Sequence, residues 1–153
     1  MRILFRVLLI VVALTIVNVH ADPVYIDANL GDNTTSNSMA YSGDVGYLFN
    51  RYFGLEGGVT FSGSSNVTDS NFYLFDAAAK GILPLSSIVD LYGKLGVGMC
   101  NDCGNGSGAN LGVLFGGGVQ FNLNKNWSLH LEDYTVTGPS PNFIMFGGEF
   151  KFY

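Results

Sequence analysis

The chain has 153 residues, of which 48% are hydrophobic, 14% aromatic and 12% charged, whereas about 25% of residues are charged in typical soluble domains. Its length predicts one domain, and its formal net charge of −5, without any basic cluster, argues against a nucleic-acid partner. Together with 21 glycines, this composition is unusual for a soluble domain and directs attention to membrane folds.

Residues 1–21 are typical of a secretory signal peptide. Two arginines precede the almost wholly apolar stretch 7–17, and Val19 and Ala21 provide compact residues for cleavage after Ala21. A membrane helix is the alternative, but it needs about 20 apolar residues and this stretch is shorter. We therefore expect a mature domain over residues 22–153, which keeps all twelve acidic residues and five of the seven Lys and Arg.

After residue 21 the chain divides into segments in which apolar and polar residues alternate, separated by residues typical of turns. No later segment has the length of a membrane helix, and lipid admits only helices and closed barrels. The sequence therefore predicts an all-β fold, an eight-stranded antiparallel up-and-down transmembrane β-barrel. The predicted strands are about residues 24–30, 40–49, 52–62, 72–83, 89–99, 109–122, 127–137 and 142–152.

The connections between these strands alternate in character. Tight turns at 50–51, 84–87 and 124–126 follow the second, fourth and sixth strands, whereas the other connections are polar and mostly longer. Bacterial outer-membrane barrels have short periplasmic turns and longer extracellular loops. The pattern predicts a bacterial outer-membrane protein with both chain ends on the periplasmic side.

The placement of charge favours a barrel over a soluble sandwich, which has the same alternation. Apart from Asp133, no charged residue falls on the apolar face of a predicted strand. Since Asp133 interrupts the alternation of its strand, we expect a β-bulge there, with Tyr134 and Val136 turned outward.

Six charged residues fall on the polar faces of the strands and are predicted to project into the lumen. Eight strands leave an interior just wide enough for side chains to fill, and buried charges need partners. We therefore expect a structural network of ion pairs. The alternative is a gate, in which an exchange of ion-pair partners opens a narrow water path. The six residues are Glu56, Lys80, Lys94, Glu132, Glu149 and Lys151.

Two further features raise the question of chemistry. Cys100 and Cys103 form a C-x-x-C motif in a predicted extracellular loop, where we expect a disulfide; zinc binding and redox chemistry are the alternatives. His130 shares a strand face with Ser128 and Glu132, but a lipid A-modifying enzyme needs its nucleophile near the outer leaflet, and Ser128 is close to a periplasmic turn. We expect a histidine that packs in the lumen, and predict no metal or cofactor.

Four segments resemble the transmembrane domain of the OmpA family: GYLFNRYFGLEGG, AAAKGILPLSSIVDLYGKLGVG, FGGGVQFNLNKNWSLHLEDY and GGEFKF. The resemblance implies an eight-stranded outer-membrane barrel in which Glu56, Lys80 and Glu132 take the places of ionised lumen residues. Many members carry a peptidoglycan-binding domain after the barrel. Since this chain stops at Tyr153, one residue beyond the last alternating aromatic, Phe152, we expect the OmpX-like, barrel-only form.

These observations predict a non-enzymatic protein with a structural or surface-interaction role similar to adhesion. A narrow ion-conducting pore is the first alternative, and a lipid A-modifying enzyme is the second. The predicted partners are outer-membrane lipids, lipopolysaccharide and the barrel-assembly machinery, which would recognise the last strand. The extracellular partner is not identified by the sequence, but the loops expose Asp32, Asp69 and Asp102 and no basic residue.

Overall fold

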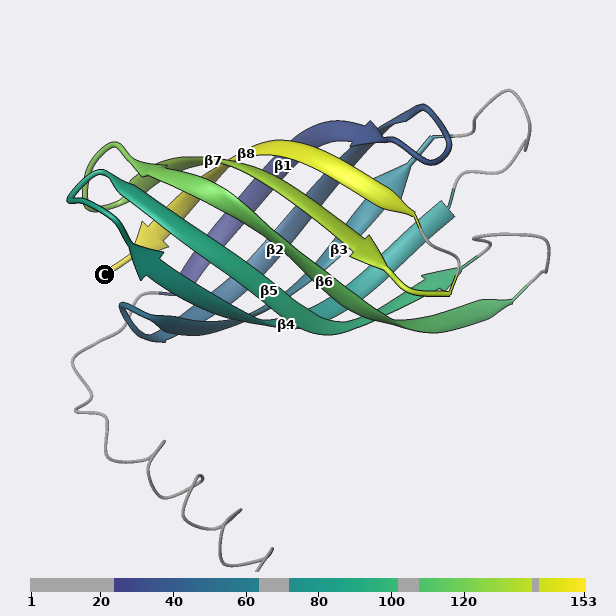
Figure 1. Cartoon of the computed structure of the whole chain (residues 1–153), viewed down its shortest axis with the longest axis horizontal. Helices are drawn as coiled ribbons and strands as arrows, with labels where there is room; N and C mark the ends of the chain where they lie inside the picture. The colour runs from purple at the N-terminus through teal and green to yellow at the C-terminus, as the bar shows by residue number, and fades with distance from the viewer. Residues whose placement is uncertain (1–23, 64–71, 102–107, 139–140) are drawn as a thin grey trace, which may run out of the picture.

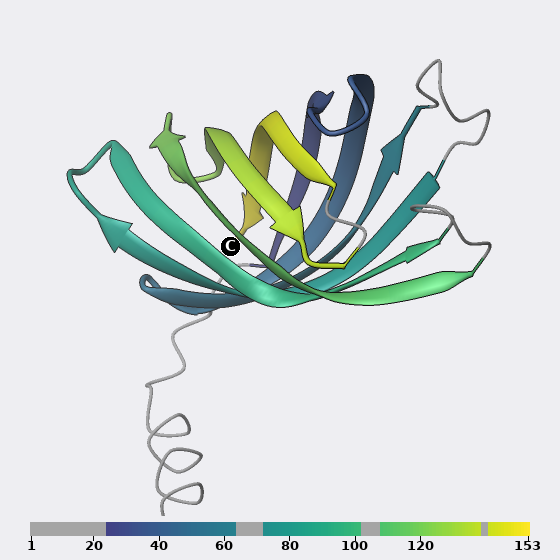
Figure 2. The same ribbon diagram turned by 45° about the vertical axis from the view of Figure 1, so that its right-hand side comes forward.

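The eight predicted strands form one closed barrel in a computed structural model, which describes residues 24–63, 72–101, 108–138 and 141–153. Each strand pairs antiparallel with its neighbour in the chain, and β1 pairs with β8 to close the barrel (Figures 1 and 2). The strands are β1 (Val24–Asn33), β2 (Ser38–Asn50), β3 (Phe53–Ser62), β4 (Phe72–Pro84), β5 (Val89–Asn101), β6 (Ala109–Asn122), β7 (Trp127–Val136) and β8 (Asn142–Phe152). None of the described residues forms a helix long and apolar enough to cross a membrane.

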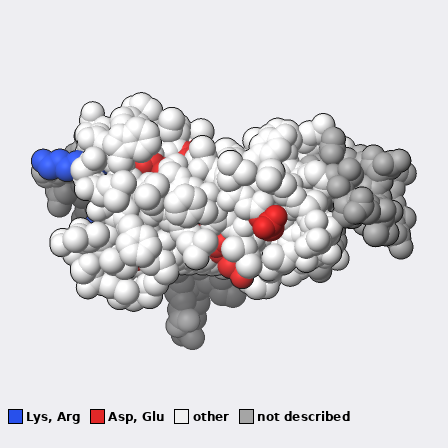
Figure 3. Space-filling view, turned by 90° about the horizontal axis from the view of Figure 1, so that it is seen from above, with Lys and Arg blue, Asp and Glu red and all other residues white. Residues whose placement is uncertain are grey.

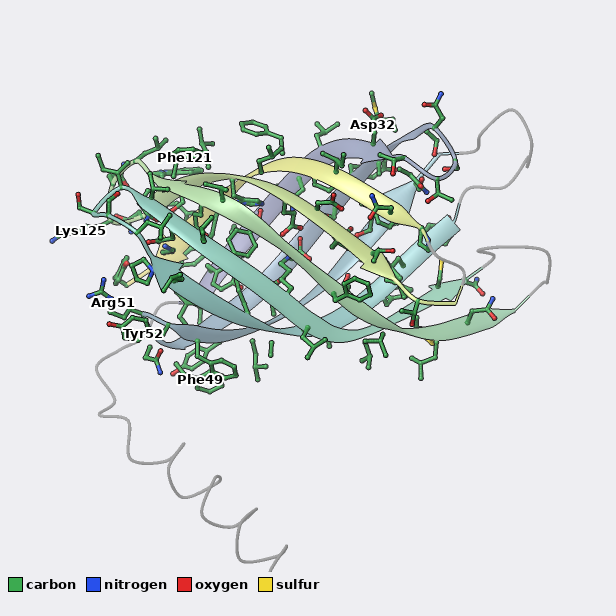
Figure 4. All side chains as sticks on the ribbon, viewed as in Figure 1. Asp32, Phe49, Arg51, Tyr52, Phe121 and Lys125 are labelled. Atoms are coloured by element: carbon green, nitrogen blue, oxygen red, sulfur yellow. The ribbon has the colours of Figure 1, made fainter. Side chains whose placement is uncertain are left out.

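The first hairpin is tighter than the sequence predicted. β1 runs on through Asp32 to Asn33, and β2 already begins at Ser38, so that Asn33 pairs directly with Ser38. The Asn33 side chain holds this turn, because its Oδ1 accepts hydrogen bonds from the backbone N–H groups of Thr35 and Ser36 at 3.1 and 3.2 Å. Asp32 consequently projects from the outer wall near the loop end of the barrel (Figure 4).

The outer wall is apolar, as a lipid-facing surface requires. Leu95, Val97 and Phe115 are about half exposed, and the face shown in Figure 3 is almost free of charge except for acidic patches and basic atoms at one end. Aromatic side chains gather near both rims, as in the girdles of membrane barrels. The contacts are Tyr41–Phe61, Phe61–Tyr73, Tyr47–Phe49, Trp127–Phe150 and Phe150–Phe152.

The bulge expected at Asp133 is absent, and this prediction was wrong. Asp133 pairs with Gly117 in unbroken register and faces outward, while Tyr134 and Val136 point into the lumen with 5% and 0% exposure. The glycines opposite explain why no bulge is needed. A Cβ at Gly116 would overlap Tyr134, and one at Gly112 would lie 2.8 Å from Val136, so these two glycines leave the room that the large inward side chains occupy.

The lumen is filled in three layers. Its extracellular end is an apolar plug of buried side chains, its middle holds the charged residues, and its periplasmic end is a polar cavity of about 320 Å³ open to solvent. The plug was not predicted from the sequence. Its largest members are Leu74, Leu114, Tyr134, Val136, Phe143 and Met145.

Candidate functional site

The structure brings the six predicted lumen charges into one network of three carboxylates and three ammonium groups. In its first half, Lys94 from β5 bridges two carboxylates from opposite sides of the lumen. Its Nζ lies 2.5 Å from Glu56 Oε1 on β3 and 2.8 Å from Glu132 Oε2 on β7. All three side chains are at least nine-tenths buried, so these ion pairs are shielded from water, and Lys94 also donates a hydrogen bond to Glu132 Oε1 at 3.0 Å.

Lys80 of β4 forms the second half of the network. Its Nζ lies 3.0 Å from Glu149 Oε2 and 3.8 Å from Glu56 Oε2, and thereby joins the two halves. The other oxygen of Glu149 lies 3.2 Å from Lys151 Nζ and accepts a hydrogen bond from Gln120 at 3.0 Å. Every carboxylate of the network thus has at least one ammonium partner, as buried charges require.

Two tyrosines that the sequence analysis did not select complete the network. Tyr25 donates to Glu56 Oε2 at 2.6 Å, and Tyr92 donates to Glu132 Oε2 at 2.9 Å. Lys80 Nζ lies 4.9 Å from the Tyr25 ring centroid and 4.5 Å from that of Tyr92, within cation–π range. The sequence could have indicated them, because both tyrosines fall at the alternate positions of their strands that face the lumen.

His130 lies in a second polar cluster beside the network, deep in the lumen and 1% exposed. Its Nε2 is 2.7 Å from Asn29 Oδ1 and 3.4 Å from Asp27 Oδ2, and Asn29 Nδ2 donates to Asp44 Oδ2 at 3.0 Å. Ser128 instead donates to Asn122 at 2.9 Å. The cluster is a set of buried polar side chains joined by hydrogen bonds, and it is enclosed in the lumen rather than turned to the lipid-facing wall.

The predicted C-x-x-C motif lies only partly within the described part of the chain. Cys100, near the end of β5, is buried and belongs to the apolar plug, and no described cysteine is free. Cys103 lies outside the described residues, so the Cys100–Cys103 disulfide stays a prediction. Within the described ranges, no group of three or more His, Cys, Asp and Glu side chains could hold a metal ion.

The periplasmic cavity gives solvent access to one side of the network. It is lined by Arg51 and Tyr153 at the rim and by Asp90 and Lys151 further in, and it ends at Gln120, which is 2% exposed. At the opposite end the apolar plug covers the charges. The lumen is therefore polar and open to solvent toward the periplasmic turns, whereas toward the loops it is filled by the plug and by the buried polar side chains of Asn33, Ser38 and Ser62.

Comparison with known proteins places this barrel among outer-membrane folds. Residues 7–138 match the family described as outer membrane protein beta-barrel domain. No curated protein matches the chain significantly.

Three solved structures share the fold. The N-terminal barrel of Pseudomonas aeruginosa OprF is 15% identical, with a TM-score of 0.68 over 85% of this chain and 97% of that one. The attachment invasion locus protein Ail of Yersinia pestis is 20% identical, with a TM-score of 0.58 over 86% and 97%. Neisserial surface protein A is 16% identical, with a TM-score of 0.61 over 87% and 98%.

Proposed function

The chain belongs to the outer membrane protein beta-barrel domain family, and we propose that it acts in the bacterial outer membrane as a non-enzymatic barrel with a structural or surface-interaction role. The filled lumen carries this proposal. Paired charges occupy its middle and the apolar plug its extracellular end, which leaves the loops and the outer wall as the surfaces available to partners.

The charge of the loops specifies the partner's chemistry. Residues 33–38, 63–71, 101–109 and 137–141 contain no Lys or Arg and are rich in Ser, Thr, Asn and Gly. Ail was solved with the heparin analogue sucrose octasulfate, a polyanion. The loops of this chain would repel such a ligand, so we propose a neutral or cationic partner recognised by hydrogen bonds.

Surface display tests this role. The chain would be expressed in the outer membrane of a Gram-negative host, and binding of the cells to neutral, cationic and heparin-coated beads would be counted. We expect binding to neutral or cationic beads, and loss of that binding when residues 34–37 and 64–71 are replaced by Gly-Ser linkers. Equal binding by the loop-replaced variant, or preference for heparin, would contradict the proposal. Resistance to SDS until boiling verifies that each variant is folded.

A narrow pore is the second candidate, supported by the two carboxylates within 4 Å of Lys80, which would allow an exchange of partners. The apolar plug adds a barrier beyond these charges. Substitution of Lys80 alone should therefore leave single-channel conductance low, and only its combination with Phe143→Ala should raise it. Conductance in the unmodified protein would favour the pore over the structural role.

We propose no enzymatic activity. A lipid A-modifying enzyme must present its catalytic groups to lipid near the outer leaflet, whereas His130 is enclosed in the lumen with Asn29 and Asp27 as its partners. Lipid A from cells that overproduce the chain should keep its mass. A mass shift that is lost in His130→Gln would overturn this proposal.

A further inference from the structure

One row of the outer wall lacks side chains where it crosses three neighbouring strands. Gly81 of β4 pairs with Gly93 of β5, and Gly93 pairs with Gly117 of β6. All three face outward, because they alternate with inward residues such as Tyr92. A Cβ added at Gly81 would meet nothing within 4 Å, and one at Gly93 only a backbone oxygen at 3.8 Å. Packing within the protein therefore does not explain these two glycines.

Large apolar side chains border this row on both sides and turn it into a groove. Two residues along each strand, Leu95 and Phe115 stand on the extracellular side, and Leu83 and Leu91 on the periplasmic side. The four are between 38% and 63% exposed, so they project from the wall. An open hollow of about 360 Å³ lies over the β4–β5 part of this row, where it is lined by Tyr52, Gly81, Gly93, Leu83 and Leu91.

The groove rises obliquely from the periplasmic rim. Its row begins at Phe53, the first residue of β3, and passes through Gly81, Gly93 and Gly117, which lie three, four and five residues from the periplasmic ends of β4, β5 and β6. Strands lie about 4.8 Å apart, so three steps span about 14 Å. Because the strands of such barrels are tilted by about 35–45°, the row rises only about 9 Å along the membrane normal and stays within one leaflet of a hydrocarbon core of about 30 Å.

A basic and aromatic pair stands at the lower end of the groove. The Arg51 guanidinium carbon lies 5.2 Å from the ring centroid of Tyr52, which itself lines the groove. Figure 4 shows both at the same end of the barrel as Lys125. Arg51 and Lys125 are the two exposed basic residues in the described part of the chain. A guanidinium group suits phosphate, which it binds through two parallel hydrogen bonds.

We propose that this groove binds one diacyl glycerophospholipid of the periplasmic leaflet, with an acyl chain along Gly81 and Gly93 and its phosphate against Arg51. The inference rests on the membrane placement in the proposed function. An acyl chain is flexible and narrow enough to follow a groove one residue wide. A second barrel is convex and broad, and Phe115 and the bordering leucines would hold its wall away from the glycines.

Native mass spectrometry of the full mature barrel, released from a neutral detergent and titrated with dioleoyl phosphatidylglycerol, tests the site. The double variant Gly81→Leu with Gly93→Leu fills the groove. We expect it to raise the Kd of the tightest lipid site by about tenfold, which corresponds to about 1.4 kcal/mol of binding free energy. Gly43→Leu is the matched control. Gly43 also faces lipid, and a Cβ there has only a backbone oxygen at 3.9 Å, so lipid binding should not change.

The headgroup contact is tested separately. Arg51→Gln should weaken phosphatidylglycerol binding by a similar factor. It should leave the binding of dioleoylglycerol, which has no phosphate, unchanged. The control Lys125→Gln should bind both lipids like the wild type. Heat-modifiable migration in SDS gels verifies that every variant is folded. Unchanged lipid affinity in the groove-filled variant would overturn the proposal, as would a wild-type dimer that this variant abolishes. Failure of the surface role would appear in bead binding and leave the lipid affinities as predicted.

Discussion

Replacing Lys94 by methionine should destabilise the barrel more than the same change at Lys80. Lys94 is the one Lys or Arg within 4.0 Å of Glu132 among the described residues, and without it Glu56 would keep only Lys80 at 3.8 Å. Leaving a buried charge unpaired costs about 3–5 kcal/mol. We expect the free energy of unfolding to fall by that amount in Lys94→Met.

The two carboxylates that contact Lys80 each have a second ammonium partner. Without Lys80, Glu56 keeps Lys94 at 2.5 Å and Glu149 keeps Lys151 at 3.2 Å. No carboxylate is then left without a cation, so Lys80→Met should cost only about 1.5–3 kcal/mol, the range for hydrogen bonds to charged groups.

Urea unfolding of the barrel in lipid vesicles measures both losses. The double variant Lys94→Met with Glu132→Gln should recover a large part of the cost, because it removes the charge that Lys94→Met leaves unpaired. Lys125→Met, in an exposed turn, is the control and should change the free energy of unfolding little. Equal losses at Lys80 and Lys94, or strictly additive losses in the double variant, would refute this account of the network.

Three further predictions concern the wall and the chain start. Phe115→Arg, in the middle of the lipid-facing side of β6, should lower the free energy of unfolding by about 2–4 kcal/mol in the same assay. Phe121→Arg, at the periplasmic rim, should lower it by at most about 1 kcal/mol. Equal losses would contradict the predicted membrane position. Gly96→Ala should lower stability by about 1–3 kcal/mol because a Cβ there overlaps the backbone of β4, whereas Gly81→Ala should be tolerated. Mass spectrometry of the mature protein should show cleavage after Ala21, and a membrane species that retains residues 1–21 would contradict the signal peptide.

The strands and their facing could be predicted because both depend on local sequence. The boundaries of β6 and β8 agree with the prediction, since alternation and flanking Asn, Gly and Pro residues define a strand within a short window. The closed architecture also followed, because an apolar chain that is predicted to be exported and has no later helical segment has few other folds. The first hairpin was predicted less well, because the Asn33 side chain makes the turn and period 2 does not reveal it.

The partners inside the lumen could not be predicted in the same way. Which charges meet depends on strand register and on which side chains reach across a closed barrel. Glu149 lies nearer to Lys80 than Glu56 does, and this follows from the pairing of β1 with β8 that closes the barrel. No local sequence pattern contains this pairing. The inward fit of Tyr134 beside Gly116 depends on β6–β7 pairing for the same reason, so local alternation at Asp133 wrongly indicated a bulge.

We conclude that the chain forms a membrane barrel whose wall faces lipid and whose lumen is filled by buried side chains toward the loops. Nitroxide labels at the consecutive β6 positions Val113, Leu114 and Phe115 test it most directly, through collision rates with oxygen, which dissolves in lipid, and with a water-soluble nickel chelate. We predict high oxygen accessibility at Val113 and Phe115, and low accessibility to both reagents at Leu114, which is 2% exposed within the plug. Strong nickel accessibility at Leu114 would show an open aqueous lumen, and equal oxygen accessibility at all three positions would contradict the barrel wall itself.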